Sequence, residues 1–83
     1  MTKLPTLTGN QVIRALEKVG FEVIRQKGSH VRLRHTKHQR RVATIPTHPG
    51  KNIGRGLLGK ILRTSELSQA EFLTLISWLL NNG

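Results

Sequence analysis

The first stretch of the chain that contains a clear hydrophobic period lies between Thr8 and Gly20. Apolar residues recur there at helical spacing, so that Val12 and Leu16 share one face. Thr8 and Gln11 have the spacing of a capping box, in which each residue supplies a hydrogen-bond partner to the other. Gly20 suits the position after a helix end. The pattern therefore predicts a first helix over residues 8–20.

The middle of the chain changes to a period of two. Large apolar or β-branched residues alternate with polar ones over residues 21–27 and again over residues 30–36. Gly28 and Ser29 between them are suited to a tight connection, which predicts a β-hairpin. A third strand is expected over residues 41–46.

Two further helices are predicted after residue 54. The apolar residues at helical spacing in the first of them are Leu57, Leu58, Ile61 and Leu62. Ser68 and Glu71 form a second capping-box pair, so a third helix is expected to run to about residue 80. We expect this helix to bury Phe72, Leu75, Ile76 and Leu79. Trp78 is also expected in the core.

The order helix, strand, strand, strand, helix, helix predicts an α+β fold. A three-stranded antiparallel sheet with the helices on one face satisfies this order and leaves the other face exposed to solvent. With 83 residues, two domains would each be too short to bury a core, so a single domain over residues 1–83 is expected. The uncharged stretch 72–83 is too short to cross a bilayer. We therefore expect a cytoplasmic protein with no membrane association.

Positive charge is concentrated in the middle of the chain. The formal net charge is +10, and residues 23–65 contain 11 of the 14 Lys and Arg residues, all four His and no acidic residue. Such an excess predicts a polyanion as partner. The chain has no Cys and no Asp, which disfavours thiol nucleophiles, zinc fingers and carboxylate-bound Mg²⁺. No metal and no cofactor are expected.

His30 is the strongest candidate for chemistry. The alternation of the second strand places His30, Arg32 and Arg34 on one face and Val31 and Leu33 on the other. Histidine titrates near neutral pH and serves as a general acid or base, while guanidinium groups suit phosphate. RNA supplies its own nucleophile, because a 2′-hydroxyl can attack the adjacent phosphorus. An exposed histidine that only contacts phosphate or solvent fits the same spacing.

The other histidines and the remaining basic residues are less distinctive. His48, in the loop over residues 46–50, is either a second catalyst or an ordinary loop residue. His35 is expected on the apolar side at the strand edge, and His38 in a solvated turn. The predicted RNA contacts are Lys27, Ser29, Arg32, Arg34, Arg40, Arg41, Lys51 and Arg55. Three aromatic residues are too few for a sheet that stacks successive bases.

The combined motifs resemble the HicA toxins of bacterial toxin-antitoxin systems. The resemblance rests on residues 19–21 after the leading helix, Gly-Ser-His at 28–30, Pro-Thr-His-Pro-Gly at 46–50 and the helix over 55–63. It implies a small ribonuclease, also described as an mRNA interferase, with a fold like a double-stranded-RNA-binding domain. It further implies a catalytic histidine at His30 and a HicB antitoxin that covers the active site.

We therefore interpret the chain as the toxin of a type II toxin-antitoxin system. It would be a metal-independent endoribonuclease that cleaves mRNA with His30, and its partners would be RNA and a HicB-like antitoxin. The alternative is a non-catalytic RNA-binding module of the same fold. A DNA-binding accessory protein is a weaker reading, because the sequence shows no helix-turn-helix pair with a basic recognition helix. The chain departs from the family at Leu57, where members usually have a small hydroxyl residue.

Overall fold

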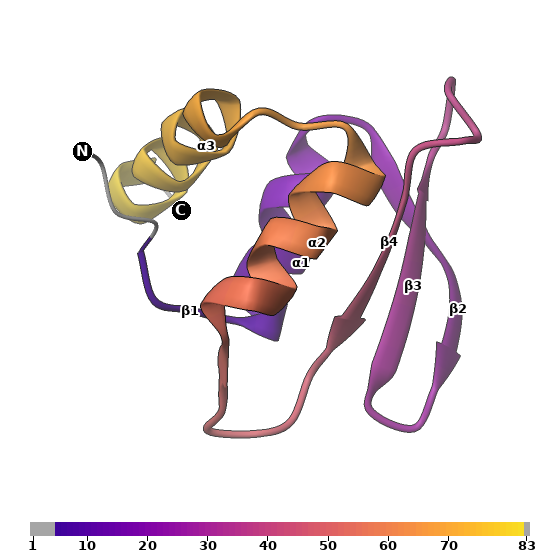
Figure 1. The fold of residues 1–83 in the computed structure, drawn as a ribbon, viewed down its shortest axis with the longest axis horizontal. Coiled ribbons are helices and arrows are strands. Elements are labelled where there is room, and N and C mark those ends of the chain that lie inside the picture. Colours follow the sequence, from indigo (N-terminus) through magenta and orange to yellow (C-terminus); the bar gives the residue numbers. More distant parts are fainter. Residues whose placement is uncertain (1–4, 83) are drawn as a thin grey trace.

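The computed structural model describes residues 5–82 and has the predicted α+β order (Figure 1). The elements are β1 (Leu7–Thr8), α1 (Gly9–Lys18), β2 (Phe21–Lys27), β3 (His30–His35), β4 (Val42–Pro46), β5 (Asn52–Ile53), α2 (Arg55–Ser65) and α3 (Gln69–Asn82). The order is consistent with a double-stranded-RNA-binding-domain-like arrangement. The sequence did not predict β1 and β5, which pair antiparallel with each other. Within residues 5–82, no helix combines the length and hydrophobicity needed to span a membrane.

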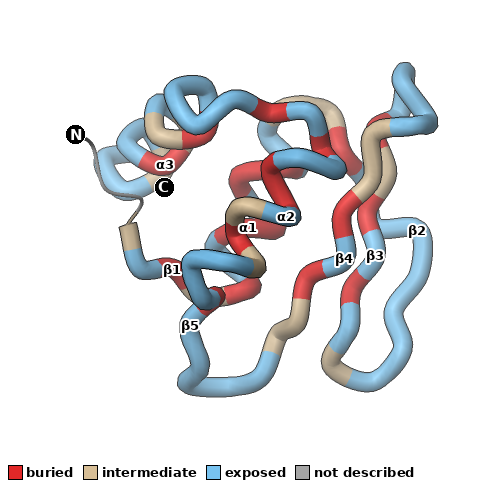
Figure 2. The backbone as a smooth tube through the Cα atoms, in the orientation of Figure 1, coloured by how far each residue is buried: buried red, intermediate tan, exposed pale blue. Residues whose placement is uncertain are grey.

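The main sheet has the strand order β2-β3-β4, and all its neighbours are antiparallel. Figure 1 shows α1 and α2 on the same face of this sheet, while α3 lies farther away beside α1. Val31 and Leu33 of β3 and Ala43 and Ile45 of β4 are buried against the helices, and the residues between them are half-buried or exposed (Figure 2). The prediction of helices on one face and an open second face is confirmed.

A break in register interrupts β2. Phe21 pairs with His35 and Val23 with Leu33, but the register shifts between Val23 and Arg25 and leaves Ile24 without a partner. Such a bulge reverses which face the following side chains occupy. Only Phe21 is buried in this strand, so β2 is an exposed edge, as the pale blue tube in Figure 2 shows.

Both predicted capping boxes are present. The Thr8 N–H donates to Gln11 Oε1 at 2.9 Å, and the Gln11 N–H donates to Thr8 Oγ1 at 3.3 Å. At α3, the Ser68 N–H donates to Glu71 Oε1 and the Glu71 N–H donates to Ser68 Oγ, both at 3.0 Å. The hydrogen bond from the Ser68 backbone lowers the pKa of the Glu71 carboxyl. These reciprocal bonds fix where each helix begins.

The prediction that Trp78 lies in the core is wrong. Its side chain is 44% exposed, and the Lys18 Nζ lies 4.0 Å from the centre of its ring. Helix α3 packs beside α1, so it buries one stripe, which Phe72 and Ile76 occupy. Trp78 comes two residues after Ile76 and so projects from a different side of the helix. Leu75 and Leu79 were also predicted to be buried, but they are only partly buried, because they lie at the margins of this stripe.

His35 lies on the apolar side of the sheet, as predicted, and its side chain is buried. Its Nδ1 accepts hydrogen bonds from the backbone N–H groups of Lys37 at 3.1 Å and His38 at 3.2 Å. Its Nε2 lies 3.0 Å from the Val19 carbonyl oxygen and therefore carries the proton that the bond requires. Both ring nitrogens are thus bonded to backbone, and the ring joins the end of α1 to the turn after β3.

This packing makes Gly20 hard to replace. Its φ is +102°, and a Cβ there would lie 2.8 Å from His35 Nε2. Gly28 also has a positive φ, +58°, but nothing lies within 4 Å of a Cβ there. We expect Gly20→Ala to lower the free energy of unfolding by roughly 3 kcal/mol, from backbone strain and overpacking together, and Gly28→Ala by about 1 kcal/mol from strain alone. Urea denaturation measures both, and equal losses would contradict the account.

Candidate functional site

One carbonyl group joins the start of β3 to the end of β4. The Ser29 carbonyl oxygen accepts hydrogen bonds from the Thr47 N–H at 2.7 Å and from Thr47 Oγ1 at 3.0 Å. Gly28, with its positive φ, is the first of the two turn residues between β2 and β3, as in a type II′ turn. The loop after β4 is therefore fixed beside this turn.

This connection brings His48 close to His30. The two ring centroids are 6.2 Å apart with an angle of 84° between the planes. Ser29 Oγ lies 3.4 Å from His48 Nε2. Both histidines are exposed at the end of the open face. Within the described range 5–82, no three His, Cys, Asp or Glu residues form a group that could hold a metal ion.

Predicted cations lie on the same open face of the sheet. Lys27 is directly opposite His30 on the neighbouring strand, and residues opposite one another in an antiparallel pair share a face. Arg32 is opposite Thr44 on β4, and its Nη1 donates to Thr44 Oγ1 at 3.1 Å. This bond holds the Arg32 side chain along the sheet. Arg34, farther from His30 on β3, is half-buried.

Arg25 is a further cation of this face, which the sequence alone did not predict. Alternation counted from the buried Phe21 places Arg25 on the helix side, but the bulge at Ile24 reverses it. Arg25 is therefore opposite Arg32 on the open face, and it is exposed. Counting back from the Gly28-Ser29 turn would have found it, because Lys27 pairs with His30 and Arg25 lies two residues before Lys27.

A cavity of about 310 Å³ opens beside His30, between the outer edge of β4 and α2. His30, Arg32 and Thr44 contribute to it from the sheet, and Leu57, Lys60 and Thr64 contribute from the helix. The three helix residues recur at intervals of three and four, so they form one stripe of α2. Leu57 supplies an apolar wall close to His30.

Two other predicted contacts lie near this end of the molecule. Lys51 is exposed in the turn after His48, and its N–H donates to the His48 carbonyl at 3.1 Å. Arg55 is the exposed first residue of α2, two positions before Leu57. Because Leu57 and His30 line the same cavity, the first turn of α2 is on the His30 side.

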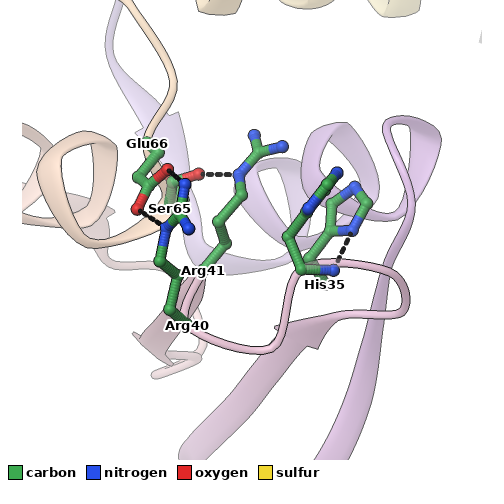
Figure 3. Close-up of polar contacts among 6 residues, drawn as sticks. His35, Arg40, Arg41, Ser65 and Glu66 are labelled. Atoms are coloured by element: carbon green, nitrogen blue, oxygen red, sulfur yellow. Dashed lines mark hydrogen bonds and ion pairs between the residues drawn. The ribbon is translucent and has the colours of Figure 1, made fainter.

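Arg40 and Arg41 form a separate cluster at the other end of the sheet (Figure 3). Arg40 Nε forms an ion pair with Glu66 Oε2 at 2.9 Å, and Arg41 Nε donates to the Ser65 carbonyl at 2.7 Å. The hydrogen bond from Arg40 lowers the pKa of the Glu66 carboxyl. The length of β3, roughly 15 to 20 Å for six residues, separates this cluster from His30. Both arginines join the β3–β4 turn to the end of α2.

A basic sheet face that carries exposed histidines is typical of a small protein that binds polyanions. The family model for the HicA toxin of bacterial toxin-antitoxin systems matches residues 9–67. The chain therefore belongs to the HicA toxin family and is a toxin of a toxin-antitoxin system. A search of curated proteins found no match. The matched segment includes His30, His48 and α2, and it ends before α3 begins at Gln69.

Proposed function

We propose that this toxin is an endoribonuclease that cleaves mRNA through His30 and His48 without a metal ion. The observation that carries the proposal is the pair of exposed imidazoles, 6.2 Å apart between centroids, at the end of a basic sheet face. At this separation the two rings reach different oxygens of one phosphodiester. Strand β3 and the loop after β4 hold them there through the Ser29 and Thr47 hydrogen bonds.

The chemistry needs one general base and one general acid. One imidazole removes the proton of the ribose 2′-hydroxyl, and the 2′-oxygen then forms a bond to the adjacent phosphorus. The bond from phosphorus to the 5′-oxygen breaks, and the other imidazole gives that oxygen a proton. The products are a 2′,3′-cyclic phosphate and a 5′-hydroxyl. His30 and His48 fill these two roles.

The cations of the open face bind the negatively charged backbone of the RNA during this step. Arg32 keeps donors free for a phosphate oxygen, because its bond to Thr44 uses only Nη1. Lys27 and Arg25 extend the positive surface onto β2. These fixed cations stabilise the negative charge on the phosphate oxygens while the fifth bond to phosphorus forms. Arg34, Lys51 and Arg55 bind phosphates farther along the strand of RNA.

Replacement of the histidines tests this proposal. His30→Ala should cleave RNA 10²- to 10⁴-fold more slowly than the wild type, the usual loss when a general acid or base is removed. His30 is exposed, so the variant should fold, and its RNA affinity should stay within a few-fold. His48→Ala should cleave RNA at least 10-fold more slowly than the wild type. The assay follows a labelled RNA in EDTA, with anisotropy for binding and circular dichroism for folding.

His38→Ala is the matched control. His38 is an exposed histidine in the turn at the far end of the sheet, so its loss should leave cleavage unchanged. Full activity of His30→Ala would remove His30 from the mechanism. Full activity of His48→Ala would contradict the proposal that the two histidines act as acid and base together. A wild-type protein that binds RNA and never cleaves it would be the non-catalytic RNA-binding module.

We further propose that a HicB-like antitoxin covers this face and buries His30. A toxin of a toxin-antitoxin system has a cognate inhibitor, and a chain of net charge +10 favours an acidic contact surface. Carboxylates of the antitoxin would occupy the positions of the RNA phosphates beside Arg32 and Lys27. Inhibition would then come from blocked access, with the toxin still folded.

Hydrogen exchange on the toxin, free and with its antitoxin, tests this arrangement. We expect protection in β3 and in the loop 46–50. The alternative contact is the outer side of α3, where Trp78 and Leu80 are exposed. That helix therefore serves as the internal comparison. Protection confined to residues after Ser68, with β3 unchanged, would overturn the proposal.

A further inference from the structure

We infer that the cavity between β4 and α2 is a subsite for one unstacked nucleobase, next to the phosphate that is cleaved. The inference rests on the proposed function and names the part of the RNA substrate that the site recognises. His30 and Arg32 belong both to the open face and to the wall of the cavity. A nucleotide whose phosphate contacts these two residues therefore has its base within reach of the cavity.

The size of the cavity suits a small planar group. Its volume of about 310 Å³ is at the lower end of the range of roughly 300 to 1,000 Å³ that is typical for small-molecule sites. Leu57, Pro46 and the buried Ile61 supply apolar surface for the face of a base. Lys60, Thr64 and Thr44 supply polar groups for its edge. Apolar walls with a few polar groups are the usual composition of such sites.

The outer edge of β4 adds backbone groups. The His35 N–H donates to the Arg41 carbonyl, and the Thr47 N–H donates to the Ser29 carbonyl. In an antiparallel pair the bonded residues alternate, so the backbone groups of Val42 and Thr44 point away from β3. Both residues line the cavity. The N–H and C=O of Thr44 thus offer one donor and one acceptor to the edge of a base.

The same geometry disfavours an added protein strand. A free strand edge often binds an extended peptide, which needs the whole edge to be open. Here Leu57, Lys60 and Thr64 of α2 lie across the edge of β4 and line the other side of the cavity. A single base fits this space. Because the base must leave its stack to enter, the substrate at this position is single-stranded RNA.

Lys60 sets the preference among bases. The ammonium group of Lys60 has three donors and no acceptor. It therefore favours a base edge with acceptors, such as O6 and N7 of guanine, over the exocyclic amine of adenine. We expect guanine and uracil to bind more tightly than adenine.

NMR titration of the wild-type protein with nucleotides that cannot be cleaved tests the subsite. The probes are guanosine 3′-monophosphate, adenosine 3′-monophosphate and ribose 5-phosphate, which has no base. Guanosine 3′-monophosphate should shift the amides of Val42, Thr44 and residues 57–64, and bind at least 5-fold more tightly than the adenosine compound. Ribose 5-phosphate should shift Arg32 and its bonded partner Thr44, but leave the amides of Lys60 and Thr64 on the far wall of the cavity unchanged.

Two variants of α2 sharpen the test. Lys60→Ala should bring the guanosine and adenosine affinities to within 2-fold of each other. Arg63→Ala is the matched control, an exposed cation on the same helix that does not line the cavity, and should keep the ratio. Shifts of the Lys60 and Thr64 amides that are as large with ribose 5-phosphate as with guanosine 3′-monophosphate, or an unchanged ratio in Lys60→Ala, would overturn the subsite. If the antitoxin shifts the Lys60 and Thr64 amides and neither nucleotide does, the cavity is a protein-docking site and the inference is wrong.

This titration is independent of catalysis. A protein that failed to cleave RNA would contradict the nuclease proposal, whereas the base subsite is decided by the shifts and the affinity ratio. A cleaving enzyme whose nucleotides bind elsewhere would contradict only the subsite.

Discussion

Strand β3 has to satisfy two environments at once, and the rest of the structure depends on this constraint. Successive side chains of a strand point to opposite faces, so Val31 and Leu33 enter the core while His30 and Arg32 remain in solvent. A slip of one residue would bury the histidine and expose the core. The burial that stabilises the fold therefore also fixes the direction of the residues proposed for chemistry.

The two ends of the sheet differ in what their side chains contact. At one end Arg41 donates to the carbonyl of Ser65, the last residue of α2, where free backbone carbonyls favour cations, and Arg40 pairs with the carboxylate of the next residue, Glu66. At the other end the Ser29 and Thr47 hydrogen bonds hold His48 beside His30. Helix α2 is thus attached at its C-terminal end, and one stripe of the helix, from Leu57 to Thr64, forms a wall of the cavity. This division leaves the groups around His30 accessible to a substrate.

Much of the fold follows from local sequence, and the site follows only in part. The capping boxes and the alternation of β3 depend on neighbours in the chain, so they were predictable. The bulge at Ile24, which moves Arg25 to the open face, and the exposure of Trp78 result from tertiary packing. The proximity of His48 to His30 and the cavity beside Lys60 join segments far apart in sequence, and no single segment indicates them.

The account's central claim is that RNA supplies the nucleophile and the protein supplies the acid and base. Mass spectrometry of the fragment ends, after cleavage in EDTA, tests it most directly. Attack by the 2′-oxygen predicts a 2′,3′-cyclic phosphate on one fragment and a 5′-hydroxyl on the other. A 3′-hydroxyl paired with a 5′-phosphate would mean that water attacks the phosphorus, and would contradict the roles proposed for His30 and His48.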